Sequence, residues 1–220
     1  MEETMKKIFI IDDSALMRRV MSDIINEDKE LKVSQVATNG LEGLALLQEG
    51  NLYDLILLDI NMPKMDGVSF LKKLTTMSIK VRVIVVSSIA SRSTQETIQA
   101  LELGAFDFIK KPDSYLVGAN NDFKEQLLKK IHLAVGLDDG TSDTELDVIK
   151  KIVRVNANLA SIPKSNKFDK DEIVFIACST GGPKSLQRVI PLLPADLACP
   201  IVIVQHMPEG FTKSLASRLN

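Results

Sequence analysis

The sequence predicts an α/β protein: a doubly wound, flavodoxin-like domain of five parallel strands, followed by a truncated second α/β parallel-sheet domain. Over the first 135 residues, short apolar runs of β type alternate with segments of helical period. A polar, turn-rich stretch then interrupts this pattern. The alternation resumes near residue 172 and yields only two further strands before residue 220.

Five strands and the helices between them make up the first domain. We predict the strands at residues 7–11, 33–38, 55–58, 81–86 and 106–109. A first helix follows from an apolar stripe at helical spacing: Leu16, Met17, Val20, Met21, Ile24 and Ile25. Later helices are predicted at residues 41–48, 68–74, 94–103 and 122–135. Gly104 suits a C-terminal helix cap directly before the fifth strand.

A linker is predicted at residues 136–171, between a first domain at residues 1–135 and a second at residues 172–220. The linker begins with turn formers that have no hydrophobic period, and it is polar again from residue 156. A short amphipathic helix is expected inside it, with Leu146, Ile149, Ile152 and Val153 on one side.

The second domain is expected to be incomplete. Its predicted elements are a strand at residues 173–178, a helix at 183–193, a strand at 201–204 and a helical segment up to Leu219. Since helices cover a parallel sheet on both faces, two strands cannot form a full core. We therefore expect residues 172–220 to be roughly the first quarter of a domain of ordinary size.

Composition and charge favour a soluble globular protein of a reducing cytoplasm. The chain has 45% hydrophobic and 25% charged residues and a formal net charge of -2, so neither general disorder nor nucleic-acid binding is expected. No apolar run is long enough to insert in a membrane, and the start lacks the basic character of a secretory signal. Cys178 and Cys199 are expected to be buried as small hydrophobes, and His132, beside two lysines, to be a solvated surface residue.

Chemically reactive side chains are predicted at the ends of four strands of the first domain. Asp12 and Asp13 follow the first strand, Asp59 the third, Ser87 and Ser88 the fourth, and Lys111 the fifth. The carboxyl ends of parallel strands meet at one edge, so three carboxylates would share one hollow, where a hard cation such as Mg2+ relieves their repulsion. An aspartate there can act as a nucleophile toward phosphorus, while Ser87 and Lys111 hold the phosphoryl oxygens. Helix capping alone would also explain the Asp12-Asp13-Ser14 run.

These residues resemble the receiver domains of two-component systems over residues 5–135. The motifs are Asp12-Asp13, the run from Leu58 to Gly67, the Ser87 strand end and Lys111-Pro112. The resemblance implies that Asp59 accepts the phosphoryl group. It implies that Asp13, Asp59 and the Asn61 carbonyl hold Mg2+, with Asp12 assisting. It also implies that Ser87 and Phe108 report phosphorylation to the partner surface. Ser88 is a second candidate for the role of Ser87. Without the resemblance, Phe108 would be interpreted as a core residue.

A serine and a histidine are the reactive residues of the second domain. Residues 177–181 (Ala-Cys-Ser-Thr-Gly) are close to the nucleophile elbow G-x-S-x-G, whose neighbours must be small because the turn from strand to helix is sharp. Pro183 interrupts the G-K-[ST] ending that a nucleotide-binding loop would need. His206 follows the next strand, at the same sheet edge as Ser179, and could act as general base. Cys178, the rival nucleophile, should point away from Ser179.

Residues 172–219 look like the catalytic domain of the chemotaxis protein-glutamate methylesterases. The motifs are the Ser-Thr-Gly-Gly-Pro turn at 179–183 and the run from Val202 to Thr212. The resemblance implies Ser179 as nucleophile and His206 as general base for hydrolysis of methyl glutamate esters, with glutamine deamidation in many members. The family needs an aspartate from a later strand end to orient the histidine. Asp169, Asp171 and Asp196 all precede their strands and cannot serve.

The sequence therefore predicts a phosphorylation-controlled protein-glutamate methylesterase of bacterial chemotaxis, truncated before its catalytic aspartate. The 220-residue chain taken alone is expected to be inactive as an esterase. The implied partners are a sensor histidine kinase and methylated chemoreceptors, and in the family the unphosphorylated receiver covers the active site. The alternative is a non-catalytic receiver that binds the kinase and accepts phosphoryl groups. A DNA-binding response regulator is disfavoured because no basic recognition helix is present.

Overall fold

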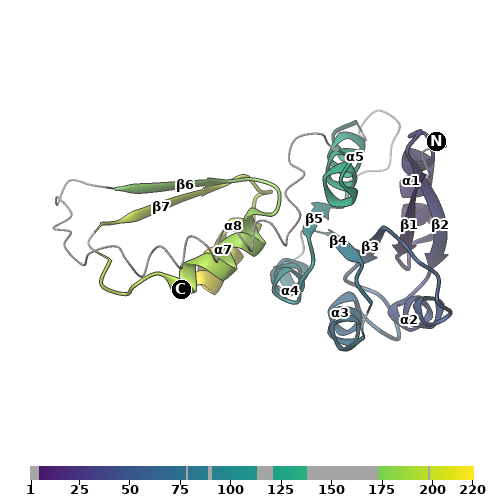
Figure 1. The fold of residues 1–220 in the computed structure, drawn as a ribbon, viewed down its shortest axis with the longest axis horizontal. Helices are drawn as coiled ribbons and strands as arrows, with labels where there is room; N and C mark the ends of the chain where they lie inside the picture. The colour runs from purple at the N-terminus through teal and green to yellow at the C-terminus, as the bar shows by residue number, and fades with distance from the viewer. Residues whose placement is uncertain (1–4, 78, 89–90, 113–120, 138–172, 198) are drawn as a thin grey trace.

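The structure, a computed structural model, describes residues 5–77, 79–88, 91–112, 121–137, 173–197 and 199–220. Five parallel strands form one sheet with the order β2-β1-β3-β4-β5, and two further parallel strands, β6 and β7, form a second sheet (Figure 1). The strands of the first sheet are β1 (Lys6–Ile11), β2 (Leu31–Ala37), β3 (Leu55–Asp59), β4 (Arg82–Ser87) and β5 (Asp107–Lys110). The five-stranded, doubly wound fold predicted from the sequence is thus confirmed.

Two layers of helices cover the first sheet, because successive residues of each strand point to opposite faces. The helices are α1 (Ala15–Asn26), α2 (Gly40–Gln48), α3 (Gly67–Thr76), α4 (Ser91–Glu102) and α5 (Asn121–Val135). Ile8 and Ile10 of β1 belong to the core cluster with α1 and α5, whereas Phe9 and Ile11 belong to the cluster with α2, α3 and α4. Figure 1 shows this separation of the helices onto the two faces.

The helix starts follow the capping chemistry of the sequence. Ser14 caps α1, Asn39 caps α2 and Asp66 caps α3, each accepting a hydrogen bond from a backbone N–H in the first turn. Gly67 opens α3 where a Cβ atom would lie 2.3 Å from the backbone oxygen of Asp59, so no larger residue fits this close approach. Gly104, after α4, has a φ of 106°, which agrees with its predicted place at the helix end.

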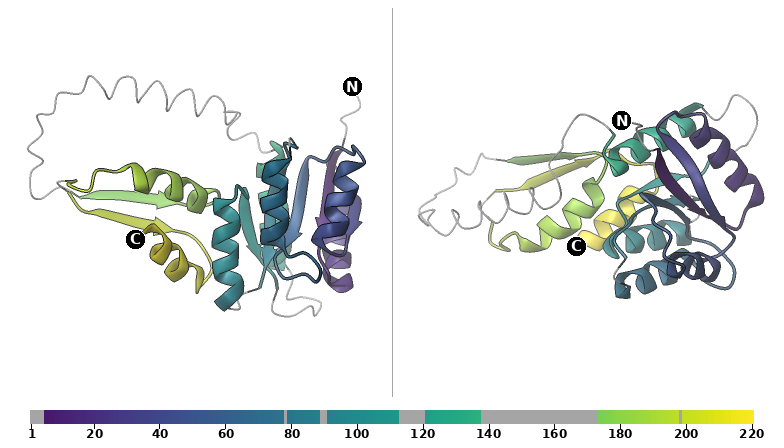
Figure 2. Two further views of the ribbon diagram at one scale, coloured as in Figure 1. Left: turned by 90° about the horizontal axis from the view of Figure 1, so that it is seen from below. Right: turned by 45° about the vertical axis from the view of Figure 1, so that its right-hand side comes forward.

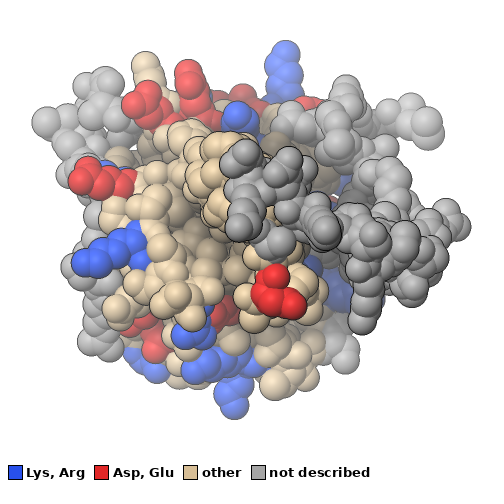
Figure 3. All heavy atoms as spheres, turned by 90° about the vertical axis from the view of Figure 1, so that its left-hand side faces the viewer, with Lys and Arg blue, Asp and Glu red and all other residues tan. Residues whose placement is uncertain are grey.

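The second unit consists of β6 (Val174–Cys178), α7 (Gly182–Val189), a 3-10 turn η1 (Ile190–Leu192), β7 (Ile201–Gln205) and α8 (Phe211–Leu219). Both helices lie beside α4 of the first unit, as the two views of Figure 2 show. Several side chains of the small sheet itself are open to solvent: Phe175 is 68% and Val204 is 58% exposed. Seen from the left-hand side of Figure 1, where β6 and β7 lie, the surface has a broad area without charged side chains (Figure 3).

The structure differs from the sequence-based expectations in one helix and at one histidine. The helix expected at residues 183–193 is shorter: α7 ends at Val189 and η1 follows, because Pro191 has no N–H to continue an α-helix. The expectation for His132 is wrong, since its Nε2 lies 2.9 Å from Asp28 Oδ2 and its side chain is only 22% exposed. The helix predicted inside residues 136–171 lies outside the described residues.

Candidate functional sites at two sheet edges

Side chains from three strand ends meet at the carboxyl edge of the five-stranded sheet. Asp12 follows β1, Asp59 is the last residue of β3 and Lys111 follows β5. The ammonium of Lys111 lies 2.9 Å from Asp12 Oδ2 and 2.9 Å from Asp59 Oδ2. Asp12 is fully buried and Asp59 is 4% exposed, so the pairing takes place in a largely dry site. The gathering of these residues agrees with what the sequence predicts.

Burial is the largest influence on the pKa values of Asp59 and Lys111. It raises the pKa of Asp59 to about 6, an effect that Lys111 opposes and Asp12 reinforces. Burial also acts to lower the pKa of Lys111, but the attraction of Asp59 and Asp12 outweighs it, and the pKa of Lys111 is raised. Lys111 is therefore a cation, and it holds the two carboxylates together.

The same hollow has the donors of a divalent-cation site. Asp12, Asp13 and Asp59 each offer a carboxylate oxygen, and these oxygens all lie within 4.8 Å of one another. Apart from the Lys111 ammonium, Asp12 Oδ2 has no hydrogen-bond partner among the described residues. Asp13 is exposed and Asn61 lies in the exposed turn after β3, so the hollow is open on that side. Hard oxygen donors around an opening suit Mg2+, which keeps several water ligands.

Ser87 and Phe108 lie next to this group. Ser87 ends β4, is fully buried, and its backbone oxygen accepts a hydrogen bond from the N–H of Lys111 at 2.8 Å. Its hydroxyl donates to the backbone oxygen of Ser88 at 3.2 Å, while Ser88 itself is exposed. Phe108, in the middle of β5, is 3% exposed.

The small sheet has a sharp turn after β6. Ser179 and Thr180 connect β6 to α7, Gly181 has a φ of 73°, and the N–H of Gly182 donates to the Ser179 backbone oxygen at 2.9 Å. A Cβ atom at Gly182 would lie 2.6 Å from Cys178 Cβ, so the Cys178 side chain faces the helix. Ser179 is exposed at the tip of the turn. This is the geometry of an exposed nucleophile between a strand and a helix.

His206 lies beside this turn because its strand is paired with β6. Cys178 pairs with Gln205, and the N–H of His206 donates to the Cys178 backbone oxygen at 3.0 Å. The amide of Gln205 donates to the backbone oxygens of Ser179 at 3.0 Å and His206 at 2.9 Å. The hydrogen bonds of the described residues include none between the side chains of Ser179 and His206. The sequence does not predict this role of Gln205; its only signal there is its position directly before the histidine.

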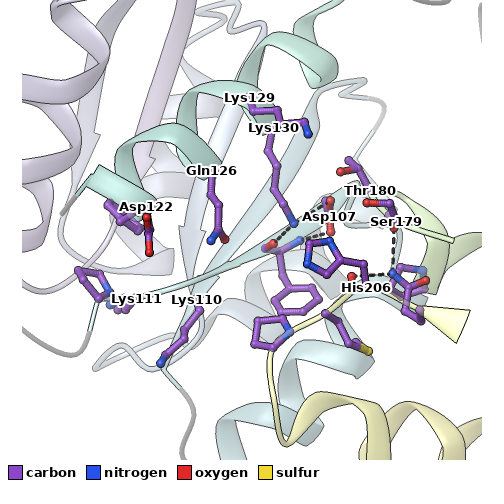
Figure 4. A pocket seen from close by; sticks show the side chains of 17 residues that line it. Asp107, Lys110, Lys111, Asp122, Gln126, Lys129, Lys130, Ser179, Thr180 and His206 are labelled. Atoms are coloured by element: carbon purple, nitrogen blue, oxygen red, sulfur yellow. Dashed lines mark hydrogen bonds and ion pairs between the residues drawn. The ribbon is translucent and has the colours of Figure 1, made fainter. Parts of the chain in front are cut away.

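Ser179 and His206 line a cavity of about 580 Å³ between the two units (Figure 4). The opposite wall comes from β5 and α5, and the lining residues there include Asp107, Phe108, Lys111, Lys129 and Lys130. Because Lys111 also binds Asp12 and Asp59, one side chain belongs to both the carboxylate hollow and this cavity.

Residues 8–117 match the family model of the response regulator receiver domain and make up half of the chain. The chain belongs to the response regulator receiver family. Residues 174–220, called the methylesterase segment below, match a second family model, CheB methylesterase. Both resemblances noted in the sequence are thereby confirmed. Receiver domains bind Mg2+ in an acidic pocket, and the group of Asp12, Asp13 and Asp59 has that composition.

Curated relatives have the same two parts in one chain. The sequence is 40% identical over 217 residues to the protein-glutamate methylesterase/protein-glutamine glutaminase 1 of Syntrophomonas wolfei. It is 41% identical over 217 residues to the protein-glutamate methylesterase/protein-glutamine glutaminase of Bacillus subtilis. These alignments cover 98% of this chain but 59% and 60% of the two relatives. The chain therefore spans about three fifths of the length of the curated relatives it matches.

Solved receiver structures match the first unit. The response regulator domain of Thermotoga maritima CheB superposes with a TM-score of 0.54 and 36% identity, covering 61% of this chain and 98% of that domain. A CheY-like receiver domain protein of Methanospirillum hungatei gives a TM-score of 0.50 at 27% identity, covering 60% of this chain and 95% of that one. Among the described helices, none combines the length and the apolar character that a membrane span requires.

The receiver and the methylesterase segment share an apolar contact. The rings of Phe108 in β5 and Phe211 in α8 stack with centroids 4.5 Å apart and an interplanar angle of 27°. Leu186 of α7 and Leu215 of α8 are buried in the same core cluster as the inner face of α4. At the rim, Arg218 donates two hydrogen bonds to Glu102, one of them between Nη2 and Oε2 at 2.6 Å. Sequence reasoning did not identify Phe211, Glu102 or Arg218, because nothing local indicates what they face.

Proposed function

We propose that the chain is the phosphorylation-responsive receiver and the first part of the catalytic domain of a chemotaxis protein-glutamate methylesterase, which also deamidates glutamine. Its substrates are methylated chemoreceptors, its phosphoryl donor is a sensor histidine kinase, and it works in the cytoplasm. The observation that best supports this function is the buried contact of Lys111 with both Asp12 and Asp59, beside an exposed Asp13. We further propose domain limits at residues 1–135 and 172–220, with a linker at 136–171.

Asp59 is the proposed phosphoacceptor. One of its carboxylate oxygens attacks phosphorus, the bond between phosphorus and the donor's leaving group breaks, and an acyl phosphate forms on Asp59. Lys111, already 2.9 Å from Asp59, donates to the phosphoryl oxygens, and the Ser87 hydroxyl turns from Ser88 toward them. Ser87 and Phe108 then transmit the change toward the methylesterase segment.

Mg2+ is the proposed cofactor of this step. Asp13, Asp59 and the Asn61 carbonyl would hold it, with Asp12 assisting, because the three carboxylates lie within one cation's reach. When bound, Mg2+ supplies positive charge that favours ionised carboxylates and offsets the charge of the phosphoryl oxygens.

Ser179 and His206 are the proposed nucleophile and general base of the esterase. The Ser179 hydroxyl loses its proton to His206 and attacks the ester carbonyl, and methanol leaves with that proton. Water, deprotonated by His206, then breaks the acyl bond to Ser179 and releases the glutamate side chain. The start of α7 also carries the positive end of the helix dipole, which favours the developing oxyanion. Gln205 keeps the turn of Ser179 close to the strand end of His206 through its two hydrogen bonds.

The docked receiver is proposed to restrict access to Ser179 and His206 until Asp59 is phosphorylated. This control is supported by Lys111, which lines the cavity between the units and also binds Asp59. The stacked rings of Phe108 and Phe211 provide the contact that phosphorylation would weaken.

The decisive experiment is phosphorylation by a small phosphodonor in the presence of Mg2+, followed by intact mass measurement. The wild-type chain should gain the mass of one phosphoryl group, and Asp59→Asn should gain none. Asp54→Asn is a matched control, because Asp54 precedes β3 at the opposite sheet edge; it should be labelled like the wild type. An unchanged mass gain in Asp59→Asn would refute the assignment.

The 220-residue chain assayed alone is proposed to release no measurable methanol from methylated receptors. Among the described residues that the methylesterase segment contributes to the cavity, none is a carboxylate that could orient His206. Loss of that carboxylate alone lowers turnover by about 10^4 in serine proteases. The second candidate function is a non-catalytic phospho-accepting receiver that binds a histidine kinase, and it needs only the contacts of Lys111 with Asp12 and Asp59. Methanol release that depends on Ser179 would exclude that candidate.

A further inference from the structure

One lysine of α5 holds the backbone and the ring of Phe108. Lys130 Nζ donates to the Phe108 backbone oxygen at 2.6 Å, lies 3.0 Å from Asp107 Oδ2, and is 5.3 Å from the centroid of the Phe108 ring. These contacts link α5 to the middle of β5, the edge strand of the receiver sheet. A charged donor to a buried acceptor makes a stronger hydrogen bond than a neutral pair does.

Asp107, the carboxylate paired with Lys130, binds the backbone N–H of Phe108. Asp107 is 2% exposed, and its Oδ1 accepts from the N–H of Phe108 at 2.8 Å. Lys130 and Asp107 therefore bind both the N–H and the oxygen of one residue. A buried carboxylate is costly unless it is paired, so this arrangement is stable only while Lys130 stays in place.

We propose that Lys130 is a positioning residue for docking of the methylesterase segment: with Asp107 it fixes Phe108 in the orientation that stacks on Phe211. The proposal rests on the proposed control of Ser179 and His206 by the receiver. According to the proposal, docking depends on the pair of Lys130 and Asp107, which lies outside the hollow of Asp12, Asp59 and Lys111. The pair faces Ser179 and His206 across the cavity of Figure 4.

The position of the pair explains how docking can respond to Asp59. Lys111 anchors the end of β5 to Asp12 and Asp59, and Lys130 anchors its middle to α5. A shift of Lys111 toward a phosphoryl group pulls one end of β5 against the fixed middle. Phe108 lies at the second anchor, so a pull on the end of β5 acts on the residue whose ring stacks on Phe211.

The neighbouring Lys129 provides a matched control. It has the same charge, lies on the same helix and lines the same cavity, yet it is exposed and makes no polar contact with β5 in the described residues. Lys130→Met and Lys129→Met therefore make the same change of charge, and only the first removes the contacts to Asp107 and Phe108.

The test measures docking directly in the unphosphorylated 220-residue chain. Hydrogen exchange of α8 (Phe211–Leu219) should be at least about tenfold faster in Lys130→Met, and unchanged in Lys129→Met. In phenylalanine-labelled protein, the ring-current shift that stacking imposes on Phe211 should disappear in Lys130→Met. Lys130→Arg should restore both signals, because its guanidinium can donate to a carbonyl and a carboxylate together.

A second variant distinguishes a general loss of stability in β5 from a specific loss of docking. Asp107→Asn combined with Lys130→Met leaves no buried charge without a partner, so β5 should exchange as in the wild type while α8 still exchanges fast. The proposal is overturned if Lys130→Met keeps the wild-type Phe211 shift, or if Lys129→Met has the same effect as Lys130→Met. These measurements need neither esterase activity nor phosphorylation, so failure of the proposed function would not affect their outcome.

Discussion

At the scale of single residues, the receiver site is a compromise between stability and reactivity. Asp59 is 4% exposed beside a fully buried Asp12, and the single cation of Lys111 contacts both. The desolvation of the Asp59 carboxylate outweighs its attraction to Lys111, and the pKa of Asp59 therefore rises to about 6. The residue types follow from the sequence, since each stands at a predicted strand end. The depth of burial does not, because it depends on how closely the flanking helices pack.

The raised pKa of Asp59 predicts a pH-dependent gain in stability for Asp59→Asn in chelator-treated protein. The native state keeps the Asp59 proton more tightly than the unfolded chain, so wild-type stability falls as pH rises from about 4 to about 6. Asn has no charge to bury, and the variant should be more stable by up to about 3 kcal/mol at pH 8. Below pH 4 both proteins should be alike, since the carboxyl is then neutral in both states. Urea unfolding at the two pH values measures this; an equal gain at both would contradict the electrostatic cause.

At the scale of elements, the turn between β6 and α7 is fixed by close contacts. A Cβ atom at Gly182 would lie 2.1 Å from Gln205 Oε1 and 2.6 Å from Cys178 Cβ. The sequence predicts the strand, the turn and the helix, because small residues and Pro183 mark them. It does not predict that Gln205 joins the turn to β7, since a glutamine inside a strand has no local signal of its partner. Motif spacing predicts Ser179 and His206, whereas the place of Gln205 follows only from the pairing of β6 with β7.

Gly182→Ala should therefore loosen the turn while leaving the receiver intact. The new methyl group displaces the Gln205 amide and presses on Cys178, at a cost of about 1 to 3 kcal/mol. Hydrogen exchange should accelerate in β6 and β7 and stay unchanged in β1 to β5. Arg188→Ala, at an exposed position of the same helix, is the control and should leave both regions as in the wild type. Equal exchange in Gly182→Ala and Arg188→Ala would mean that the turn tolerates a side chain.

At the scale of the whole molecule, the two units are joined by an apolar contact with a charged rim. Phe211 is fully buried, and Leu186 and Leu215 are 2% and 4% exposed, although all three belong to a segment with a largely open sheet. Helical periodicity indicates that α8 has an apolar side but cannot say which surface covers it. In the structure that surface is the inner part of α4 and Phe108, so the receiver covers one side of the small sheet's helices.

The relative weight of core and rim can be tested with Phe211→Ala and Arg218→Ala. Truncating a fully buried phenylalanine costs about 3 to 5 kcal/mol, whereas an exposed ion pair contributes about 0.2 to 1 kcal/mol. The Arg218 side chain is 60% exposed, so its pair with Glu102 belongs to the weaker class. Small-angle scattering should show a larger radius of gyration for Phe211→Ala and a wild-type value for Arg218→Ala. The reverse order would mean that the ion pair holds the units together, and docking would then weaken steeply with salt, because screening acts on exposed charges and spares a buried stack.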